Sequence, residues 1–239
     1  MGFHRFTYPS ADLAADACAR QVLLRLEEAL SGHGKATLAV SGGSTPKLMF
    51  AHLAKTRFEW RDVHLFWVDE RMVPPNDAES NYHLCEQHFL LPARFPRRNV
   101  HRIQGELRPE TAAKNYVDDL REFFNLDAGG VPHFDVIHLG IGADAHTASL
   151  FPGEPLILDR AGIAAAVLVE KFAKWRVTLL PRTLLEAKHV LVLAAGNDKT
   201  EALKNVLDAP YDPMRYPAQI VSHHSRHQTW FLDEAAVSA

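Results

Sequence analysis

Residues 36–54 read ATLAVSGGSTPKLMFAHLA, and this stretch decides the fold class. Its first five residues are an uninterrupted apolar run, which is typical of a strand buried on both faces. SGGSTP is a glycine turn, and KLMFAHLA has the pattern of a helix. Further apolar runs occur at residues 63–68, 134–139 and 189–195, interleaved with predicted helices. The pattern predicts an α/β fold with a doubly wound, mostly parallel sheet and helices on both faces.

The whole 239-residue chain, residues 1–239, is expected to form one domain, because it shows no internal repeat and no linker. Apolar residues recur every fourth position from Ala14 to Leu30 after Ser10, a good N-cap, so we expect one helix over residues 10–31. That helix is the only element expected before the first strand. Further helices are predicted near residues 81–90 and 199–207, and residues 92–108 form an irregular surface connection.

Composition excludes several classes of function. The net charge of −3 and the lack of basic runs argue against a nucleic acid partner, and no apolar window is long enough for a membrane span or signal peptide. We therefore expect a cytoplasmic protein. Cys18 and Cys85 are predicted to be buried free thiols. The spacing of His223, His224 and His227 could hold a metal, but without a nearby acid or cysteine a polar surface turn is favoured, and no metal is predicted.

Ligands of such sheets bind beyond the carboxyl ends of the strands, and four of these ends carry candidate residues. The first is the loop after residues 36–40, whose backbone N–H groups can cradle a phosphate. It comprises Ser41, Gly42, Gly43, Ser44 and Thr45. The loop lacks the spacing of a nucleoside-triphosphate loop. The alternative is a purely structural glycine turn.

Two further strand ends carry charged groups. Asp69, Glu70 and Arg71 follow residues 63–68, and the arginine can bind a phosphate or stabilise an oxyanion, although a surface ion pair is the alternative. Lys199 begins a predicted helix after residues 189–195, and Arg176 is a further candidate cation. Cations facing an anion cradle indicate a phosphorylated small molecule.

The fourth strand end is GIGADAHTASLFPG, residues 140–153. It formally fits a dinucleotide-binding fingerprint, but Pro152 and Pro155 limit the following helix to about two turns. His146 is better explained as a general base or acid, and Asp144 can orient it or contact a sugar hydroxyl. A histidine with a purely structural role in the turn is the alternative. Ser149 is not expected to be a nucleophile, because no second partnered base accompanies it.

Together these motifs resemble the superfamily of 6-phosphogluconolactonases and glucosamine-6-phosphate deaminases. The resemblance runs from about Phe6 to Asp233, and its carriers are SGGSTP, DER with ESNY, GIGADAHTASLFPG, RVTLL, GNDK and the tail PAQIVSHHSRHQTWFLDEAA. The deaminase pattern has a tyrosine or similar residue after Asp-Glu and a glutamate five residues after its histidine. Arg71 and Phe151 stand at those positions here. The resemblance therefore implies lactone hydrolysis.

The resemblance implies a Rossmann-like fold and hydrolysis of 6-phospho-D-glucono-1,5-lactone to 6-phospho-D-gluconate in the oxidative pentose phosphate pathway, without metal or organic cofactor. It implies three catalytic residues: His146 as the general base that activates water, Asp144 as its orienter and Arg71 as the oxyanion stabiliser. The implied binding residues are Ser41, Gly42, Gly43, Ser44, Thr45, Asp69, Gly142, Arg176 and Lys199. A deaminase-like isomerase and a non-catalytic phosphosugar-binding module are the alternatives, and the oligomeric state, monomer or dimer, stays open.

The chain departs from the family pattern at two places. Ala145 stands where the family usually has glycine, and a positive φ there would cost about 1 kcal/mol or more and tilt His146. Phe172, Ala173, Lys174 and Trp175 replace a segment that is often proline-rich.

Overall fold

The computed structural model describes residues 2–238, and its centre is a seven-stranded sheet in the order β1-β10-β9-β6-β2-β3-β5. Every strand pair in it is parallel. Its strands are β1 (Gly2–Tyr8), β2 (Ala36–Val40), β3 (Val63–Trp67), β5 (Val100–His101), β6 (Val136–Leu139), β9 (His189–Ala194) and β10 (His227–Asp233). The expected doubly wound, Rossmann-like α/β class is confirmed.

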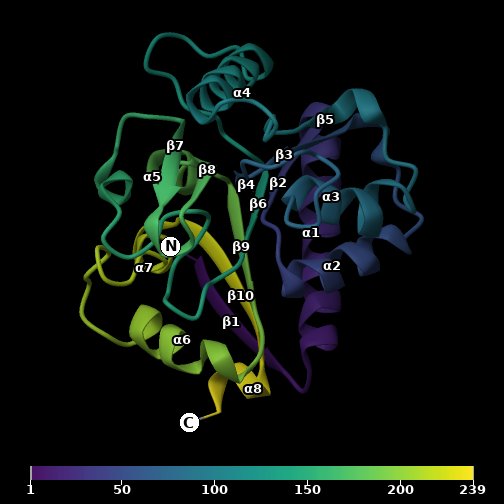
Figure 1. Ribbon diagram of the computed structural model, residues 1–239. Helices are drawn as coiled ribbons and strands as arrows, with labels where there is room; N and C mark the ends of the chain where they lie inside the picture. The colour runs from purple at the N-terminus through teal and green to yellow at the C-terminus, as the bar shows by residue number, and fades with distance from the viewer. Residues whose placement is uncertain (1, 239) are drawn as a thin grey trace.

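Helices cover both faces of this sheet (Figure 1). On one side lie α1 (Ala11–His33), α2 (Ser44–Ala54) and α3 (Asn81–Cys85), and on the other lie α5 (Pro181–Leu185), α6 (Thr200–Leu207) and α7 (Gln219–His224). The chain also forms α4 (Pro109–Phe123), beside the second sheet, and a short C-terminal α8 (Glu234–Val237). Cys18 and Cys85 are buried free thiols, as expected, and burial raises the pKa of both. Within residues 2–238 no helix is long and apolar enough to cross a bilayer.

A second, three-stranded sheet is joined to the seven-stranded one. It pairs β4 (Asp69–Arg71), β8 (Lys174–Leu179) and β7 (Ala164–Val169) in antiparallel fashion. Val68 joins the two sheets, because its N–H donates to Val40 of β2 while its carbonyl accepts from Leu179 of β8. The DER motif is therefore a strand in its own right, and Arg71 lies opposite Arg176.

The N-terminal region differs from the expectation of a single helix. Residues 2–8 form β1, an edge strand whose five central residues are exposed, so they show no continuous apolar run. The helix α1 begins after Ser10 as predicted, with the Ser10 side chain accepting from the Leu13 N–H. It runs to His33, two residues past the expected end at residue 31, and Gly34 takes the left-handed conformation that terminates a helix.

The segment after His146 also differs from the expectation of up to two helical turns. Ala145 and Ala148 have φ angles of 64° and 52°, which break a helical path, and the chain makes successive tight turns instead. A 3₁₀ helix follows at Pro155–Leu158. The helix predicted near residues 81–90 is confirmed as α3 continued by a π-helical turn, Glu86–Leu90. The 92–108 connection is irregular except for a 3₁₀ turn, Arg97–Asn99, and the short edge strand β5.

Candidate active site

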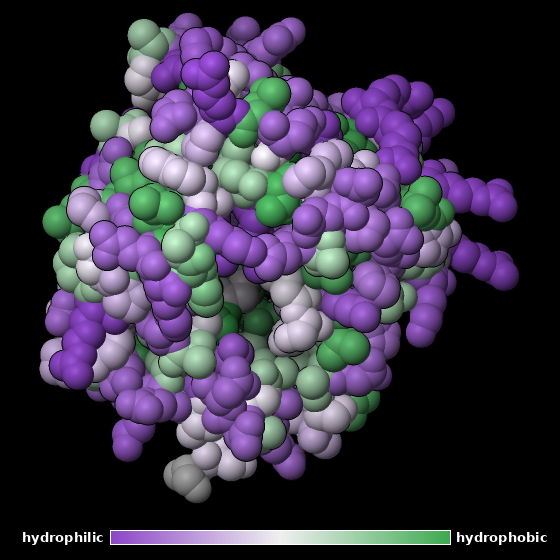
Figure 2. Space-filling view, in the orientation of Figure 1, coloured by the Kyte–Doolittle hydropathy of each residue, from purple (hydrophilic) through white to green (hydrophobic). Residues whose placement is uncertain are grey.

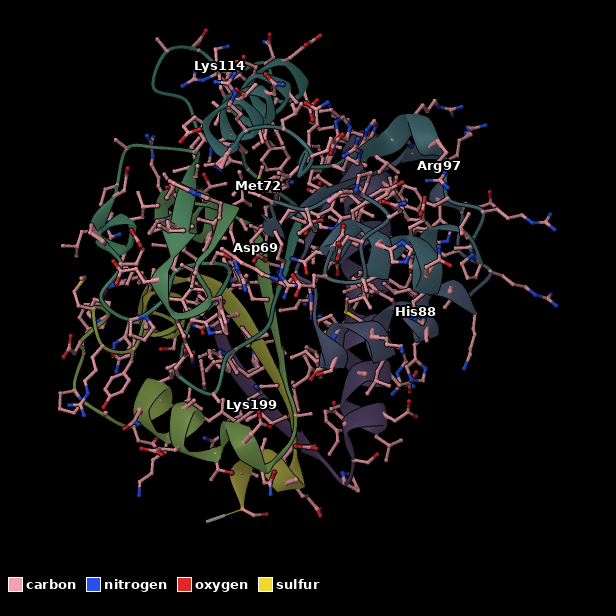
Figure 3. The ribbon with its side chains drawn as sticks, viewed as in Figure 1. Asp69, Met72, His88, Arg97, Lys114 and Lys199 are labelled. Atoms are coloured by element: carbon pink, nitrogen blue, oxygen red, sulfur yellow. The ribbon has the colours of Figure 1, made fainter. Side chains whose placement is uncertain are left out.

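A cleft of about 190 Å³ opens where β2, β6 and β9 end and the second sheet approaches them. Figure 2 shows a hollow near the middle of this face, with hydrophilic residues around it. Figure 3 labels Asp69 on β4 and Lys199 before α6, above and below that hollow in this view. All but one of the expected catalytic and binding residues line the cleft: Ser41, Gly42, Gly43, Ser44, Thr45, Asp69, Arg71, Gly142, His146, Arg176 and Lys199. The exception, Asp144, is bonded to the His146 ring.

The loop between β2 and α2 forms one wall of the cleft. Gly43, with a φ of 123°, precedes α2, and no described side chain caps that helix, so the first N–H groups of α2, on residues that line the cleft, are free donors. A helix N-terminus of this kind attracts anions. A Cβ added to Gly42 would lie 1.9 Å from Oδ1 of Asn81, so residue 42 must be glycine for the loop to pack here.

Positive charge faces this loop from the second sheet. Arg176 is nearly buried, and its Nη1 lies 3.7 Å from Oδ2 of Asp69. Burial lowers the pKa of Arg176, while Asp69 opposes that shift. The Nε groups of Arg71 and Arg176 are both buried without a hydrogen-bond partner among residues 2–238. Two adjacent guanidinium groups with unused donors favour an anionic ligand. Lys199 lines the same cleft, with its Nζ 2.8 Å from Oδ2 of Asp198.

The remaining wall carries a histidine–carboxylate pair. Nδ1 of His146 lies 2.5 Å from Oδ1 of Asp144, and Nζ of Lys171 lies 2.9 Å from the other carboxylate oxygen. Burial alone raises the pKa of Asp144, but the hydrogen bonds from His146 and Lys171 outweigh it and hold the pKa well below its usual range. The ring of Phe151 stacks on the imidazole, with centroids 4.0 Å apart. Because Nδ1 is engaged by Asp144, Nε2 is the ring nitrogen left for proton transfer.

The turn that presents His146 is fastened by backbone hydrogen bonds. The Gly142 N–H donates to the His146 carbonyl, the Ala145 N–H to the Gly142 carbonyl, and the Ala218 N–H to the Ala145 carbonyl. Ala145 has the positive φ that makes alanine unfavourable there. The expected conformational strain at Ala145 therefore applies. The His146 ring nevertheless lies within hydrogen-bond distance of Asp144. Gly142 packs against the imidazole, since a Cβ at that position would lie 2.0 Å from Nδ1.

Three residues of the site were not assigned from the sequence. Asn81 lines the cleft and is fixed by a bond from Nδ2 to the Asp69 carbonyl; the ESNY motif was a signal for it. Ser149 is buried and donates to Oδ2 of Asp69 at 2.6 Å, which makes it a support for that carboxylate. Lys171 gave no local signal, because it is 27 residues from its partner Asp144.

The histidines at the C-terminal end lie away from the cleft. His223 and His224 end α7 beside Tyr211, and His227 begins β10. Among the described residues, no three His, Cys, Asp or Glu side chains form a group that could hold a metal ion.

Known proteins resemble the whole chain. Residues 9–230 match the model of the family described as glucosamine-6-phosphate isomerases/6-phosphogluconolactonase. A 6-phosphogluconolactonase from Haemophilus influenzae is 33% identical, with 97% of each chain covered. One from Homo sapiens is 37% identical and covers 95% of this chain and 89% of its own. The solved 6-phosphogluconolactonase of Trypanosoma brucei superposes with a TM-score of 0.87 at 26% identity, covering 98% of this chain and 97% of that one.

Proposed function

The chain belongs to the glucosamine-6-phosphate isomerase/6-phosphogluconolactonase family, and on that premise we propose that it hydrolyses 6-phospho-D-glucono-1,5-lactone with His146 as general base. One observation carries the assignment of roles: His146, hydrogen-bonded to Asp144, shares one cleft with an anion cradle and opposing cations. An anionic phosphate and a reacting carbonyl on one small sugar match that arrangement.

Substrate binding begins at the phosphate. The free N–H groups of residues 41–45 and the side chains of Arg176 and Lys199 bind its oxygens. Asp69 forms an ion pair with the Arg176 guanidinium, and it accepts a hydrogen bond from the Ser149 hydroxyl. This anchoring fixes the lactone carbonyl beside His146, so that water attacks a carbon of defined position.

Hydrolysis then proceeds by general base catalysis. Nε2 of His146 removes a proton from a water molecule as its oxygen bonds to the lactone carbonyl carbon, which gives a tetrahedral oxyanion. Arg71 stabilises the negative charge on that oxygen. When the oxyanion collapses, the bond to the ring oxygen breaks, and the imidazolium returns its proton to the departing oxygen. Asp144 accepts from Nδ1–H throughout and keeps the imidazole in the required tautomer.

The alternatives fit the cleft less well. In the deaminase pattern a carboxylate stands five residues after the histidine, whereas Phe151 stands there and stacks on the ring. A non-catalytic phosphosugar-binding module has no need of a histidine held by an ionised carboxylate. The two buried free cysteines, Cys18 and Cys85, suit the reducing cytoplasm that we infer as the location.

The test is turnover of freshly prepared lactone at neutral pH, corrected for spontaneous hydrolysis. We expect His146→Asn to lower kcat by at least about 100-fold, the usual contribution of a general base, while binding of 6-phosphogluconate persists. His133→Asn, at an exposed histidine outside the cleft, is the matched control and should leave kcat unchanged. A wild-type rate equal to background, or an unchanged rate in His146→Asn, would refute the proposal.

A further inference from the structure

The turn between β7 and β8 reaches the histidine–carboxylate pair from a distant part of the chain. Lys171, in this turn, places Nζ 2.9 Å from Oδ2 of Asp144. Oδ1 of the same carboxylate contacts Nδ1 of His146 at 2.5 Å. The carboxylate is therefore held at both oxygens, by the imidazole on one side and by an ammonium group on the other.

The turn itself is held in place. Phe172 packs edge-on against Phe151, with centroids 5.8 Å apart, and Phe151 stacks on the His146 ring. Lys174 forms an ion pair with Glu79 on the far side of the turn. Ala173 between them takes a left-handed φ of 49°, which reverses the chain. Lys171 is thus presented to Asp144 by a turn that contacts neighbouring elements on both sides.

We propose that Lys171 is a positioning residue for the lactonase reaction, which keeps the Asp144 carboxylate aligned with His146 and offsets part of its negative charge. The inference rests on the proposed function. Without the ammonium group, the full negative charge of Asp144 acts on the imidazole and favours its protonated form. A protonated imidazole cannot accept a proton from water, so activity at the acid side of the pH profile should fall first.

Other charged side chains surround the Asp144–His146 pair, and all of them are present in both the wild type and a variant at residue 171. Some line the cleft with His146, and others line the cavity beside Asp144: Asp69, Arg71, Arg176, Lys199, Glu154 and Glu170. Arg176 also lies over the Phe151 ring that stacks on His146. A difference between the wild type and a variant at residue 171 therefore reports the contribution of Lys171.

The experiment compares kcat/KM from pH 5 to 9 in the wild type, Lys171→Gln and Lys171→Arg. Lys174→Gln is the matched control, because it removes one positive charge three residues further along the chain, at the start of β8, without touching Asp144. The lysine side chain is 60% exposed. One charge in such a solvated setting should move the acid-side midpoint of Lys171→Gln upward by about half a pH unit. At pH 6 this lowers kcat/KM about threefold, through kcat rather than KM, and Lys171→Arg restores the wild-type profile.

A Lys171→Gln profile that overlays the wild type overturns the inference. So does a loss of equal size at every pH, because that is the signature of a structural defect in the turn. If the wild type shows no turnover, the proposed function fails instead, and NMR titration of the His146 ring in labelled protein still decides the inference. Its midpoint must rise in Lys171→Gln, and an unchanged midpoint refutes the role of Lys171.

Discussion

Replacing Gly142 with alanine should inactivate the enzyme without removing any functional group. A Cβ at Gly142 would lie 2.0 Å from Nδ1 and 2.2 Å from Cε1 of His146, and 2.7 Å from Oδ1 of Asp144. An ordinary contact begins near 3.4 Å, so the imidazole must retreat by about 1.4 Å. Misplacing a catalytic group by about 1 Å costs on the order of 100-fold in rate. We therefore expect kcat/KM of Gly142→Ala to fall by about 100-fold or more.

Gly140→Ala is a closely matched control. Gly140 lines the same cleft, yet no described atom lies within 4 Å of a Cβ placed there. Neither glycine has a φ in the left-handed range, so neither alanine strains the backbone. Gly140→Ala should keep kcat/KM within about twofold of the wild type, and both variants should unfold within about 1 kcal/mol of it, because the clash at Gly142 involves side chains that can move.

The assay is lactone hydrolysis for both variants, with urea unfolding followed by circular dichroism. A kcat/KM for Gly142→Ala within threefold of that for Gly140→Ala would refute the reasoning, because His146 would then tolerate displacement. Loss of activity together with unfolding would also count against it, since the contact would then support the fold rather than the imidazole position.

Three further predictions concern other residues. His138 is fully buried with both ring nitrogens unpartnered among residues 2–238, and burial lowers its pKa to about 3. Below about pH 6.5 the unfolded chain therefore binds a proton at residue 138 that the folded protein does not bind. From there towards pH 3 the free energy of unfolding of the wild type should fall by about 1.4 kcal/mol per pH unit more than that of His138→Leu. An equal fall in both proteins between pH 7 and pH 5, measured by urea unfolding, would contradict this. Arg176→Gln should raise KM for the lactone and Kd for 6-phosphogluconate at least about tenfold with a smaller effect on kcat, and unchanged values would exclude a phosphate contact. Ala145→Gly should change the free energy of unfolding by less than about 1 kcal/mol, because relief of the positive φ is offset by the flexibility of glycine in the unfolded chain; a larger change in denaturant unfolding would show that the balance is wrong.

Local patterns predicted the elements that are buried on both faces. β2, β3, β6 and β9 read as continuous apolar runs, because helices cover both sides of each strand. β1 escaped prediction for the opposite reason, since it is an exposed edge strand. The second sheet escaped as well. β4 is only three residues long and pairs with β8, which lies about a hundred residues later, so no short window of sequence contains that interaction.

In the candidate site, too, some residues could be predicted from the local sequence and others could not. The glycine loop at residues 41–45 and the His146 turn could be inferred from their own residues, because glycine, proline and histidine have local conformational and chemical consequences. The neighbours of those residues could not. Ser149 contacts Asp69 across 80 positions, and Lys171 contacts Asp144 across 27.

Local sequence patterns were thus enough to predict the parallel α/β architecture, the strand ends that meet in the cleft and the residue types able to bind phosphate and accept a proton. Strand pairing and turns, by contrast, bring Lys171 to the Asp144 carboxylate, Ser149 to Asp69, and Arg71 opposite Arg176. The difference arises because some properties depend on neighbours in sequence and others on contacts between distant parts of the chain. Backbone conformation and burial follow from neighbouring residues, whereas the electrostatics of a site depend on distances between side chains that strand pairing and turns bring together.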